Sequence, residues 1–257
     1  MDYLVFRLYG PMASWGEIAI GESRHSADYP SKSAITGLLA AALGIRREEE
    51  SVHHNLSKCY LQAVKVRRSG WLLRDYHTAQ APDSAGKFRY RTRRDEIVTG
   101  RDRLGTVLSS REYRSDADAL VAVRALDGAL YSLTNLADAL MKPKFHLYLG
   151  RKACALAAPL NPLVIQADNF HGALENYEVK PVLKPTPEWA SDSRWLPQDK
   201  LVRFYWEGDM EEFFPMDTNM DKSSVQRLSR YDMPLSRKRW QFEPRQEYLW
   251  TTERRIG

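Results

Sequence analysis

The stretch Tyr3-Leu-Val-Phe-Arg-Leu-Tyr-Gly-Pro11 decides how this sequence begins to fold. Leu4, Phe6 and Leu8 face one way and the residues between them face the other, which is the period-two pattern of a half-buried β-strand. Gly10-Pro11 ends the strand, because proline cannot donate to a ladder and glycine relaxes the turn. The first element is therefore a strand with at least one covered face.

A helix is expected after the polar loop that follows. Pro30-Ser31-Lys32-Ser33 opens it, with either Ser31 or Ser33 as the N-cap, and Gly44 lies just past its last turn. The small residues between Ala34 and Ala42 let such a helix pack closely on a sheet.

The later elements complete an α+β pattern. We expect two strands around a turn at Ser69-Gly70, then a strand, a helix stopped by Pro143 and a last strand. Their ranges are 59–66, 71–76, 120–125, 133–141 and 145–149. This order is close to the βαββαβ ferredoxin-like plan of RRM domains, but one strand is left over, so the pairing order stays open.

The chain of 257 residues is long enough for one large domain or two small ones. Residues 1–150 are expected to form the ferredoxin-like domain. Residues 151–257 are rich in proline and hold strand-like runs at 201–206 and 246–250. They predict a β-rich C-terminal extension packed on the core.

The composition excludes several classes of protein. No apolar run reaches the roughly 18 residues of a membrane span, and the N-terminus lacks the pattern of a secretory signal. Cys59 and Cys154 give no zinc spacing. We therefore expect a soluble, cytoplasmic protein with no cofactor, no metal site and no membrane partner.

The net charge of +5 is unevenly distributed. Residues 87–114 and 222–255 each contain nine basic and four acidic residues, whereas residues 188–221 contain nine acidic and three basic ones. A solvated surface of mixed sign is the plain interpretation, but two basic blocks with interleaved aromatics favour a phosphate backbone as partner. In the second block the candidate RNA contacts are Arg237, Lys238 and Arg239.

Residues 87–94 of the first block, Lys-Phe-Arg-Tyr-Arg-Thr-Arg-Arg, alternate with period two. A strand would place its basic residues on one face at intervals of ~6.6 Å, which suits phosphate groups. A turn at 99–102 and a return strand at 103–110 would then make a basic β-hairpin, about 79–110, that projects from the sheet. An exposed solubilising loop is the alternative, and a helix here, or arginines paired with acids of the same chain, would contradict the prediction. The candidate RNA contacts are Lys87, Arg89, Tyr90, Arg91 and Arg93.

The segments that flank this hairpin add candidates at its base. Tyr76, His77 and Tyr113 could stack on splayed bases at ~1–3 kcal/mol each, with Arg111 beside them. The alternative for the tyrosines is a place in the core.

The sequence contains no recognisable catalytic motif. None of its six histidines lies in a metalloprotease or hydrolase pattern, and no glycine-rich phosphate loop occurs. These patterns identify no catalytic residue. A metal-independent ribonuclease needs only one side chain near a 2′-OH, so that activity stays open as the alternative.

Several blocks together resemble one family over nearly the whole chain. They are LYGPMASWG (8–16), PSKSAITGLLAAALGI (30–45), YHTAQ (76–80), REYRSDA (111–117), LYLGRKAC (147–154) and PLSRKRWQF (234–242). They resemble the CasD subunits of type I-E CRISPR Cascade, in the Cas-five branch of the RAMP superfamily.

The resemblance implies a ferredoxin-like RAMP domain with a β-hairpin thumb. It implies an RNA-binding structural subunit of a multisubunit complex in antiviral defence, which grips the repeat-derived 5′ tag of the crRNA and caps the backbone filament. Its partners would be the crRNA, the filament subunits and the large subunit that reads the PAM, with target DNA met only through the complex. By carry-over, the residues near the tag would be Arg24, His25, Lys32 and Ser33, at a helix N-terminus that suits phosphate, and Gly150, Arg151 and Lys152.

Type I-C relatives cut precursor RNA with tyrosine, lysine and histidine. This sequence has no clear adjacent Lys-His pair, because Lys144-Phe145-His146 has the wrong spacing. The resemblance therefore favours the non-cleaving branch, and an endoribonuclease that processes precursor crRNA is the alternative.

Overall fold

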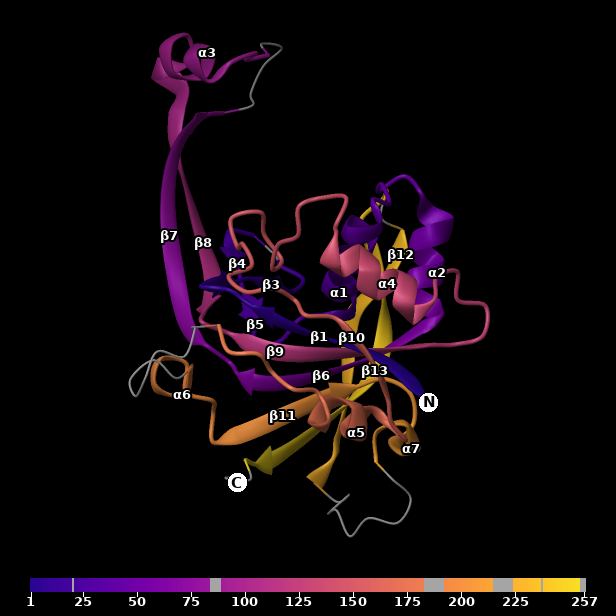
Figure 1. Cartoon of the computed structure of the whole chain (residues 1–257). Helices are drawn as coiled ribbons and strands as arrows, with labels where there is room; N and C mark the ends of the chain where they lie inside the picture. Colours follow the sequence, from indigo (N-terminus) through magenta and orange to yellow (C-terminus); the bar gives the residue numbers. More distant parts are fainter. Residues whose placement is uncertain (20, 84–88, 183–191, 215–223, 237, 255–257) are drawn as a thin grey trace.

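The computed structural model describes residues 1–19, 21–83, 89–182, 192–214, 224–236 and 238–254. It is a mixed α/β body with antiparallel sheets, from which a long two-stranded ribbon projects (Figure 1). The strands are β1 (Asp2–Tyr9), β2 (Met12–Ala13), β3 (Trp15–Gly16), β4 (Ser23–Arg24), β5 (Ser26–Ala27), β6 (Tyr60–Arg68), β7 (Trp71–Pro82), β8 (Leu104–Ser115), β9 (Asp118–Ala125), β10 (Leu163–Gln166), β11 (Leu201–Trp206), β12 (Gln226–Ser236) and β13 (Gln241–Glu253). The helices are α1 (Lys32–Leu43), α2 (Glu50–Lys58), α3 (Arg93–Val98), α4 (Leu133–Met141), α5 (Phe170–Glu175), α6 (Asp192–Trp195) and α7 (Met210–Phe213), with a 3₁₀ turn at Arg101–Arg103.

The main sheet has seven strands in the order β10-β1-β9-β6-β11-β13-β12. Each neighbouring pair is antiparallel, with Phe6 of β1 opposite Val121 of β9. The C-terminal strands join through β11, which pairs with β6. Strands from both ends of the chain therefore share one sheet.

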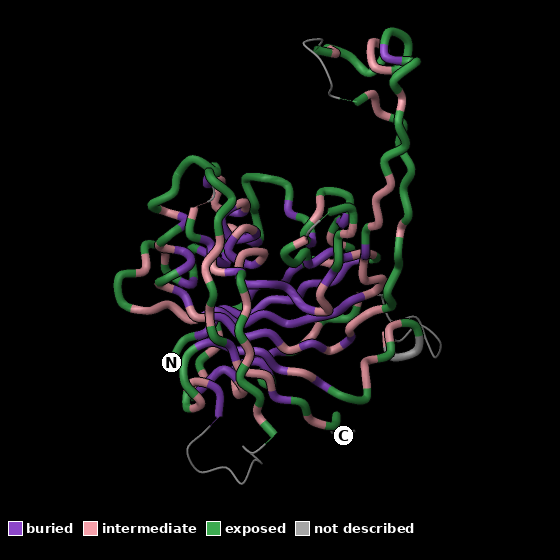
Figure 2. Tube along the Cα trace, turned by 180° about the vertical axis from the view of Figure 1, so that it is seen from behind, coloured by how far each residue is buried: buried purple, intermediate pink, exposed green. Residues whose placement is uncertain are grey.

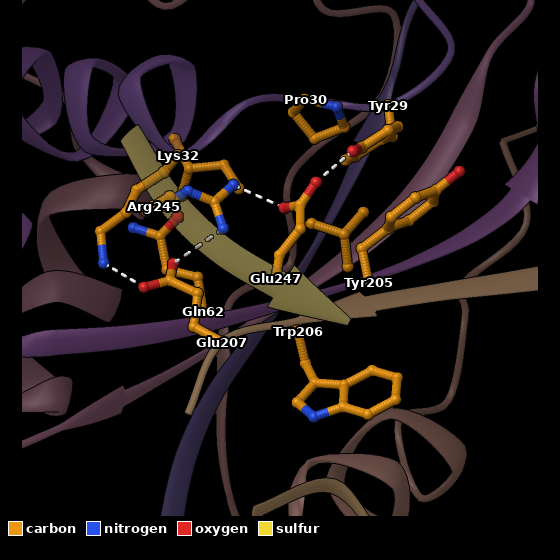
Figure 3. A pocket seen from close by; sticks show the side chains of 11 residues that line it. Tyr29, Pro30, Lys32, Gln62, Tyr205, Trp206, Glu207, Arg245 and Glu247 are labelled. Carbon is orange, nitrogen blue, oxygen red and sulfur yellow. Dashed lines mark hydrogen bonds and ion pairs between the residues drawn. The ribbon is translucent and has the colours of Figure 1, made fainter. Parts of the chain in front are cut away.

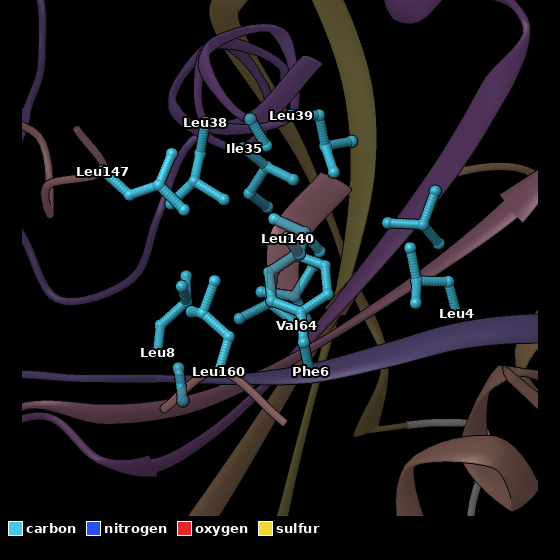
Figure 4. Close-up of a cluster of buried hydrophobic side chains, with 14 of the residues drawn as sticks. Leu4, Phe6, Leu8, Ile35, Leu38, Leu39, Val64, Leu140, Leu147 and Leu160 are labelled. Atoms are coloured by element: carbon cyan, nitrogen blue, oxygen red, sulfur yellow. The ribbon is translucent and has the colours of Figure 1, made fainter. Parts of the chain in front are cut away.

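Both faces of this sheet are covered, and the strands in the body are buried (Figure 2). Leu4, Phe6 and Leu8 of β1 pack against α1 and α4 in one hydrophobic cluster (Figure 4). Tyr3 and Val5 lie in a second cluster beneath α5 and α7. The alternation predicted for β1 is confirmed, but the strand is buried on both faces and not half-buried as expected, because its two faces contribute to two separate cores.

The expected helix is α1, and its N-cap is Ser31. The Oγ of Ser31 accepts the N–H of Ala34 at 3.2 Å. At the other end Gly44 has φ +79°, a left-handed conformation that glycine adopts without strain, and its N–H bonds back into the last turn. The sequence therefore predicted both ends of this helix correctly.

The turn at Ser69-Gly70 does not join a hairpin, which corrects the sequence prediction. Strand β7 pairs with β8 over its whole length, from Trp71 opposite Ser115 to Pro82 opposite Leu104, and it leaves the sheet to which β6 belongs. Gly70 has φ +73° and packs so closely on the main chain of Ser115 that no Cβ would fit. The β7–β8 ribbon therefore starts near residue 71, not near 79.

Residues 87–94 do not form the expected basic strand. Residues 89–92 have no regular structure and α3 follows, begun by a capping box between Thr92 and Asp95; Lys87 lies outside the described residues. The guanidinium of Arg93 donates to Glu96 at 2.7 Å and to the carbonyl of Gln80 at 2.6 Å. The prediction of arginines aligned along one strand is wrong, because a local cap and an internal ion pair organise this segment.

The predicted strand 145–149 is also absent. The N–H groups of Lys144 and Phe145 bond to carbonyls at the end of α1, and residue 148 makes only an isolated bridge to Ala155. His146, within this segment, is exposed. The strand beside β1 is instead β10, which lies beyond residue 150, the expected end of the first domain. No helix in the described part of the chain is long and apolar enough to cross a membrane.

Candidate nucleic-acid interface

Segments far apart in the sequence meet where the β7–β8 ribbon leaves the body. Strand β4 lies parallel to β8, with Arg24 opposite Arg111, and β2 pairs with the end of β8. The Oγ of Ser14 donates to the carbonyl of Glu112 at 3.1 Å. We call this region the ribbon base: residues 71–77 and 109–115, with the loops 23–26 and 149–152 packed on them.

A buried carboxylate, Glu112, organises one face of the ribbon base. Its Oε1 accepts Arg74 at 2.8 Å and lies 3.3 Å from Nδ1 of His25, and its Oε2 accepts the N–H of Ser26 at 3.3 Å. Burial alone would raise the pKa of Glu112, but hydrogen bonds from Arg74, Ser26 and His25 outweigh it and lower the pKa below its ordinary value. The ionised carboxylate therefore ties the loop that carries Arg24 and His25 to the ribbon.

On the other face, Arg151 covers the ring of Tyr113. Its guanidinium carbon lies 4.9 Å from the ring centroid, a cation–π contact. The Nη1 of Arg151 is buried and has no hydrogen-bond partner among the described residues. The guanidinium of Arg151 therefore keeps an N–H donor that no described residue uses, beside the ring of Tyr113. Such a donor can bind a phosphate oxygen or the carbonyl oxygen of a base.

A glycine holds the Arg151 loop against the ribbon base. Gly150 has φ +87°, and a Cβ at this position would overlap the carbonyl oxygen of Ser14. The N–H of Ser14 donates to the carbonyl of Leu149 at 3.0 Å. Gly150 therefore sets the distance between the two loops, and exposed Lys152 follows on the same loop.

The pairing register of β7 and β8 places the aromatic candidates on opposite faces of the ribbon. Leu73 lies opposite Tyr113 and Tyr76 opposite Ser110, so Tyr113 and His77 share one face and Tyr76 lies on the other. His77 also contacts the carboxylate of Asp75. Tyr76 is 63% exposed and is free of the core, whereas Tyr113 is partly buried under Arg151.

Lys32 does not lie at an RNA-accessible surface, which corrects the expectation for this residue. Its ammonium is buried, contacts Glu207 and donates to the carbonyl of Tyr60 at 3.1 Å (Figure 3). Its main-chain N–H donates to Asp232 at 2.8 Å, so a carboxylate of this chain already occupies the first turn of α1. The Oγ of neighbouring Ser33 lies 3.0 Å from that of Ser31.

The pKa values reflect this burial. Burial lowers the pKa of Lys32, and the charge of Glu207 offsets this in part. For Glu207, burial raises the pKa against the opposing charges of Lys32 and Arg245. The Lys32–Glu207 ion pair therefore belongs to the folded core, and Lys32 does not offer its charge to a ligand.

A network of balanced charge surrounds the pair and joins α1 to the C-terminal strands. Arg245 donates to Asp232 at 2.6 and 2.9 Å. It also donates to Glu247 at 2.6 Å, and Tyr29 donates to the same carboxylate (Figure 3). Arg230 lies 4.3 Å over the ring of Tyr29. The cations Lys32, Arg230 and Arg245 face the anions Glu207, Asp232 and Glu247, so the network leaves no net charge for a polyanion.

The other candidates lie away from the ribbon base. Arg89 and Arg91 are exposed near the far end of the ribbon, and Tyr90 is partly buried there. Lys238 and Arg239 are exposed at the turn between β12 and β13, where the N–H of Lys238 donates to Glu50 of α2 at 3.2 Å; Arg237 lies outside the described residues. The structure thus gathers nine candidates at the ribbon base: Arg24, His25, Tyr76, His77, Arg111, Tyr113, Gly150, Arg151 and Lys152. The other described candidates lie apart from it.

Sequence reasoning missed three residues of the ribbon base. Arg74 and Glu112 lie opposite each other across the ribbon, and Trp71, on the face of Tyr113, is 73% exposed. Only the acid inside the basic run 111–114 hinted at an internal partner. Within the described ranges, no three His, Cys, Asp or Glu side chains gather closely enough to hold a metal ion.

Comparison with known proteins identifies the family of this chain. A family model described as CRISPR-associated protein (Cas_Cas5) matches residues 3–248. The CRISPR system Cascade subunit CasD of Escherichia coli strain K12 is 35% identical over 185 residues, which are 69% of this chain and 77% of that protein.

Two solved structures are similar along almost the whole chain. A chain of a CRISPR RNA-guided surveillance complex has a TM-score of 0.61 and 26% identity, covering 98% of this chain and 90% of its own. A second, titled as the crystal structure of a Cas protein, has a TM-score of 0.58 and 25% identity, covering 98% and 94%. The chain belongs to the Cas5 family of CRISPR-associated proteins.

Proposed function

We propose that this chain is an RNA-binding structural subunit of a type I-E Cascade surveillance complex. It grips the 5′ tag of the crRNA at the ribbon base, caps the backbone filament and does not cut RNA. The observation that carries the proposal is the convergence of Arg24, Arg111 and Arg151 with Tyr113, from three separate segments, at one accessible place. Cations beside an aromatic ring bind the phosphates and bases of single strands.

The topology supports a ferredoxin-like core with a thumb. Strands β10, β1, β9 and β6 lie side by side, α1 connects β1 to β6, and α4 connects β9 to β10. The β7–β8 ribbon, inserted between β6 and β9, would be the thumb. We retain a core of about 1–150 and an extension of 151–257 as part of the proposal, with β10 supplied from beyond the boundary.

The partners follow from the relatives and from the exposed surface. A CasD relative is a Cascade subunit and a similar structure is part of an RNA-guided surveillance complex. At the start of β7, Trp71 and Leu73 are exposed on one face of the ribbon and Leu72 on the other, and apolar side chains this exposed suit a protein neighbour that covers this end of the strand. We assign this surface to a filament subunit, the large subunit to another face, and target DNA to indirect contact through the complex.

Endoribonuclease activity is the second candidate, because two exposed imidazoles lie beside carboxylates at the ribbon base. His25 is close to Glu112, and His77 contacts Asp75. An imidazole paired in this way can act as a general acid or base on a 2′-OH. We favour the binding role because these carboxylates also serve structural contacts, as Glu112 does for Ser26.

One experiment separates the two candidates. The purified chain is incubated without divalent metal with repeat-derived RNA and with a shuffled RNA of equal length, and binding and product formation are followed together. We expect bound, intact RNA with preference for the repeat sequence. Arg151→Ala should weaken binding and reduce the salt-dependence slope by ~0.7 if one phosphate contact is lost. Cleavage that disappears in His25→Ala or His77→Ala would instead establish the nuclease.

A further inference from the structure

The loop that follows α4 belongs to a stretch of sequence whose charged residues are all basic. Between Asp138 and Asp168 the chain contains no acidic residue, and its basic residues are Lys142, Lys144, Arg151 and Lys152. The two basic blocks identified from the sequence, 87–114 and 222–255, each contain acids. This stretch is therefore the longest part of the chain that offers cations with no local neutralisation.

This loop is anchored at two places, the end of α1 and the ribbon base. At one end the N–H groups of Lys144 and Phe145 bond to carbonyls of Ala42 and Ala41 at the end of α1. At the other end the loop meets the ribbon base through Leu149 and Arg151. In Figure 1 the segment after α4 crosses toward β3 and β4 at the foot of the ribbon. The seven Cα-to-Cα steps from Lys144 to Arg151 span at most roughly 25 Å.

The side chains along the loop divide into an anchored set and an exposed set. Leu147 and Leu149 are buried in the cluster beneath α1 (Figure 4 labels Leu147). Phe145 and Tyr148 are 43% and 37% exposed. Buried leucines therefore hold the loop in place while aromatic rings stand at its surface beside lysines.

The lysines of this loop are unpaired in the described part of the chain. Lys142, Lys144 and Lys152 are exposed and form no ion pair there, whereas Lys58 contacts Glu243 at 2.5 Å and Lys65 contacts Glu175 at 2.6 Å. Exposed cations with aromatics between them, in a stretch that holds no acid from residue 139 to 167, are complementary to a single-stranded polyanion. An acidic protein would satisfy the charge but would leave the exposed rings without stacking partners.

We propose that the loop 142–152 extends the RNA interface from the ribbon base to the end of α1. Lys142 and Lys144 contact backbone phosphates, and Phe145 and Tyr148 stack on bases that continue beyond the nucleotides held at Arg151. The inference rests on the proposed function, since it assumes that the ribbon base binds RNA. It adds a second set of contacts, remote from that site and engaged only by a longer strand.

The test uses RNA length as the variable. Wild type, Lys142→Ser/Lys144→Ser and Phe145→Ala are compared on a short oligonucleotide, sized to cover the ribbon base alone, and on one several nucleotides longer at either end. The longer RNA should lose roughly tenfold in affinity with Phe145→Ala, and its salt slope should fall by about 1.4 with the double lysine variant, at ~0.7 per phosphate. The short RNA should bind all three proteins equally.

A matched control removes the same charge elsewhere. Lys180 and Lys200 are exposed, and Lys180 lies on the sheet face covered by α5, where its carbonyl accepts Arg7. Lys180→Ser/Lys200→Ser should leave both RNAs unaffected, and thermal melting should show that every variant is folded. Equal binding of the long RNA by wild type and both loop variants would overturn the inference.

The outcomes also separate this inference from the proposed function. If the ribbon base does not bind RNA, wild type will not bind the short oligonucleotide and Arg151→Ala will change nothing. If only the loop assignment is wrong, the short RNA will bind, Arg151→Ala will weaken it, and the loop variants will have no effect. Loop variants that leave RNA binding intact but fail to assemble with other Cascade subunits would reassign the loop to a protein contact and overturn the proposal.

Discussion

The carboxylate of Asp232, on β12, accepts the main-chain N–H of Lys32 at the start of α1 at 2.8 Å. A residue near the end of the chain thus supplies the anion that a helix N-terminus attracts. The same carboxylate receives two hydrogen bonds from Arg245. This contact explains why the first turn of α1 is not a phosphate site in this protein.

Replacing Asp232 by alanine should be strongly destabilising. The change leaves the guanidinium of Arg245 buried without its bidentate partner and removes the cap on Lys32, for a loss of about 3–5 kcal/mol in the free energy of unfolding. Urea denaturation measures it. Asp127→Ala, at an exposed turn, is the control and should change stability by less than about 0.5 kcal/mol. An Asp232→Ala protein as stable as wild type would show that the network contributes nothing.

Lys32 and Glu207 should behave as a coupled pair. Lys32→Met or Glu207→Gln alone leaves the other member of the pair buried without its main charged partner, and each should destabilise the fold by about 3–5 kcal/mol. The double variant should recover much of this loss, which a double-mutant cycle of unfolding free energies measures. RNA affinity of the folded double variant should equal that of wild type. If the folded double variant bound RNA more weakly than wild type, Lys32 would have to be counted among the RNA contacts.

Gly150→Ala should weaken RNA binding although glycine has no side chain to contact RNA. The new Cβ would overlap the carbonyl of Ser14 and push the Arg151 loop away from Tyr113. Gly128→Ala is the matched control, since Gly128 also has a positive φ, of +83°, and the nearest atom to its new Cβ would be the Sγ of Cys59 at 4.0 Å. The control should cost only the strain of about 1–2 kcal/mol and leave RNA affinity unchanged. Equal effects of the two variants would indicate that loop position is irrelevant to binding.

Glu112 should make the ribbon base sensitive to acid. Its pKa in the folded protein is below the ordinary value, because hydrogen bonds to the carboxylate outweigh burial. Its stabilising contribution is therefore complete above the ordinary glutamate pKa of about 4.3 and is lost as the pH falls through the lower folded value. The urea midpoint of wild type should drop more steeply between pH 5 and 3 than that of Glu112→Gln. The exposed residue Glu22, changed to Gln, should leave the wild-type slope intact.

Local sequence patterns predicted the helices and strands whose bounds are set by residues close in the sequence. The alternation of residues 3–9 identified β1, the serine and glycine signals identified both ends of α1, and the run 133–141 identified α4. Each depends on neighbours within a few residues. Strand β11, at 201–206, was predicted for the same reason.

Two predicted strands are wrong because their sequence patterns are compatible with more than one local structure. The alternation of residues 87–94 has the period of a strand, but no ladder partner covers it, and the cap from Thr92 to Asp95 starts a helix instead. Residues 145–149 have strand-like composition, yet Pro143 and the bonds to the end of α1 hold them as a loop. Strand β10 was missed because its four residues are a weak signal next to Pro162.

The candidate site was predicted only in part, since burial by distant residues cannot be read from a local pattern. The loop residues Arg24 and His25 and the ribbon residues Arg111 and Tyr113 do meet. Lys32, by contrast, is neutralised by Glu207, 175 residues along the chain. A lysine in a basic context looks the same in the sequence whether it faces solvent or a distant carboxylate.

The pairing of Lys32 with Asp232 and Glu207 also has a consequence for how the protein is made. A ribosome synthesises α1 long before it reaches β11, β12 and β13, which carry these carboxylates and complete the sheet beside β6. A nascent chain that stops short of them presents an open strand and an unneutralised ammonium, and such intermediates are prone to aggregation. The N-terminal half therefore completes its sheet and these charge pairs only once β11 to β13 have been synthesised, and a truncation that removes these strands should leave β6 as an open edge.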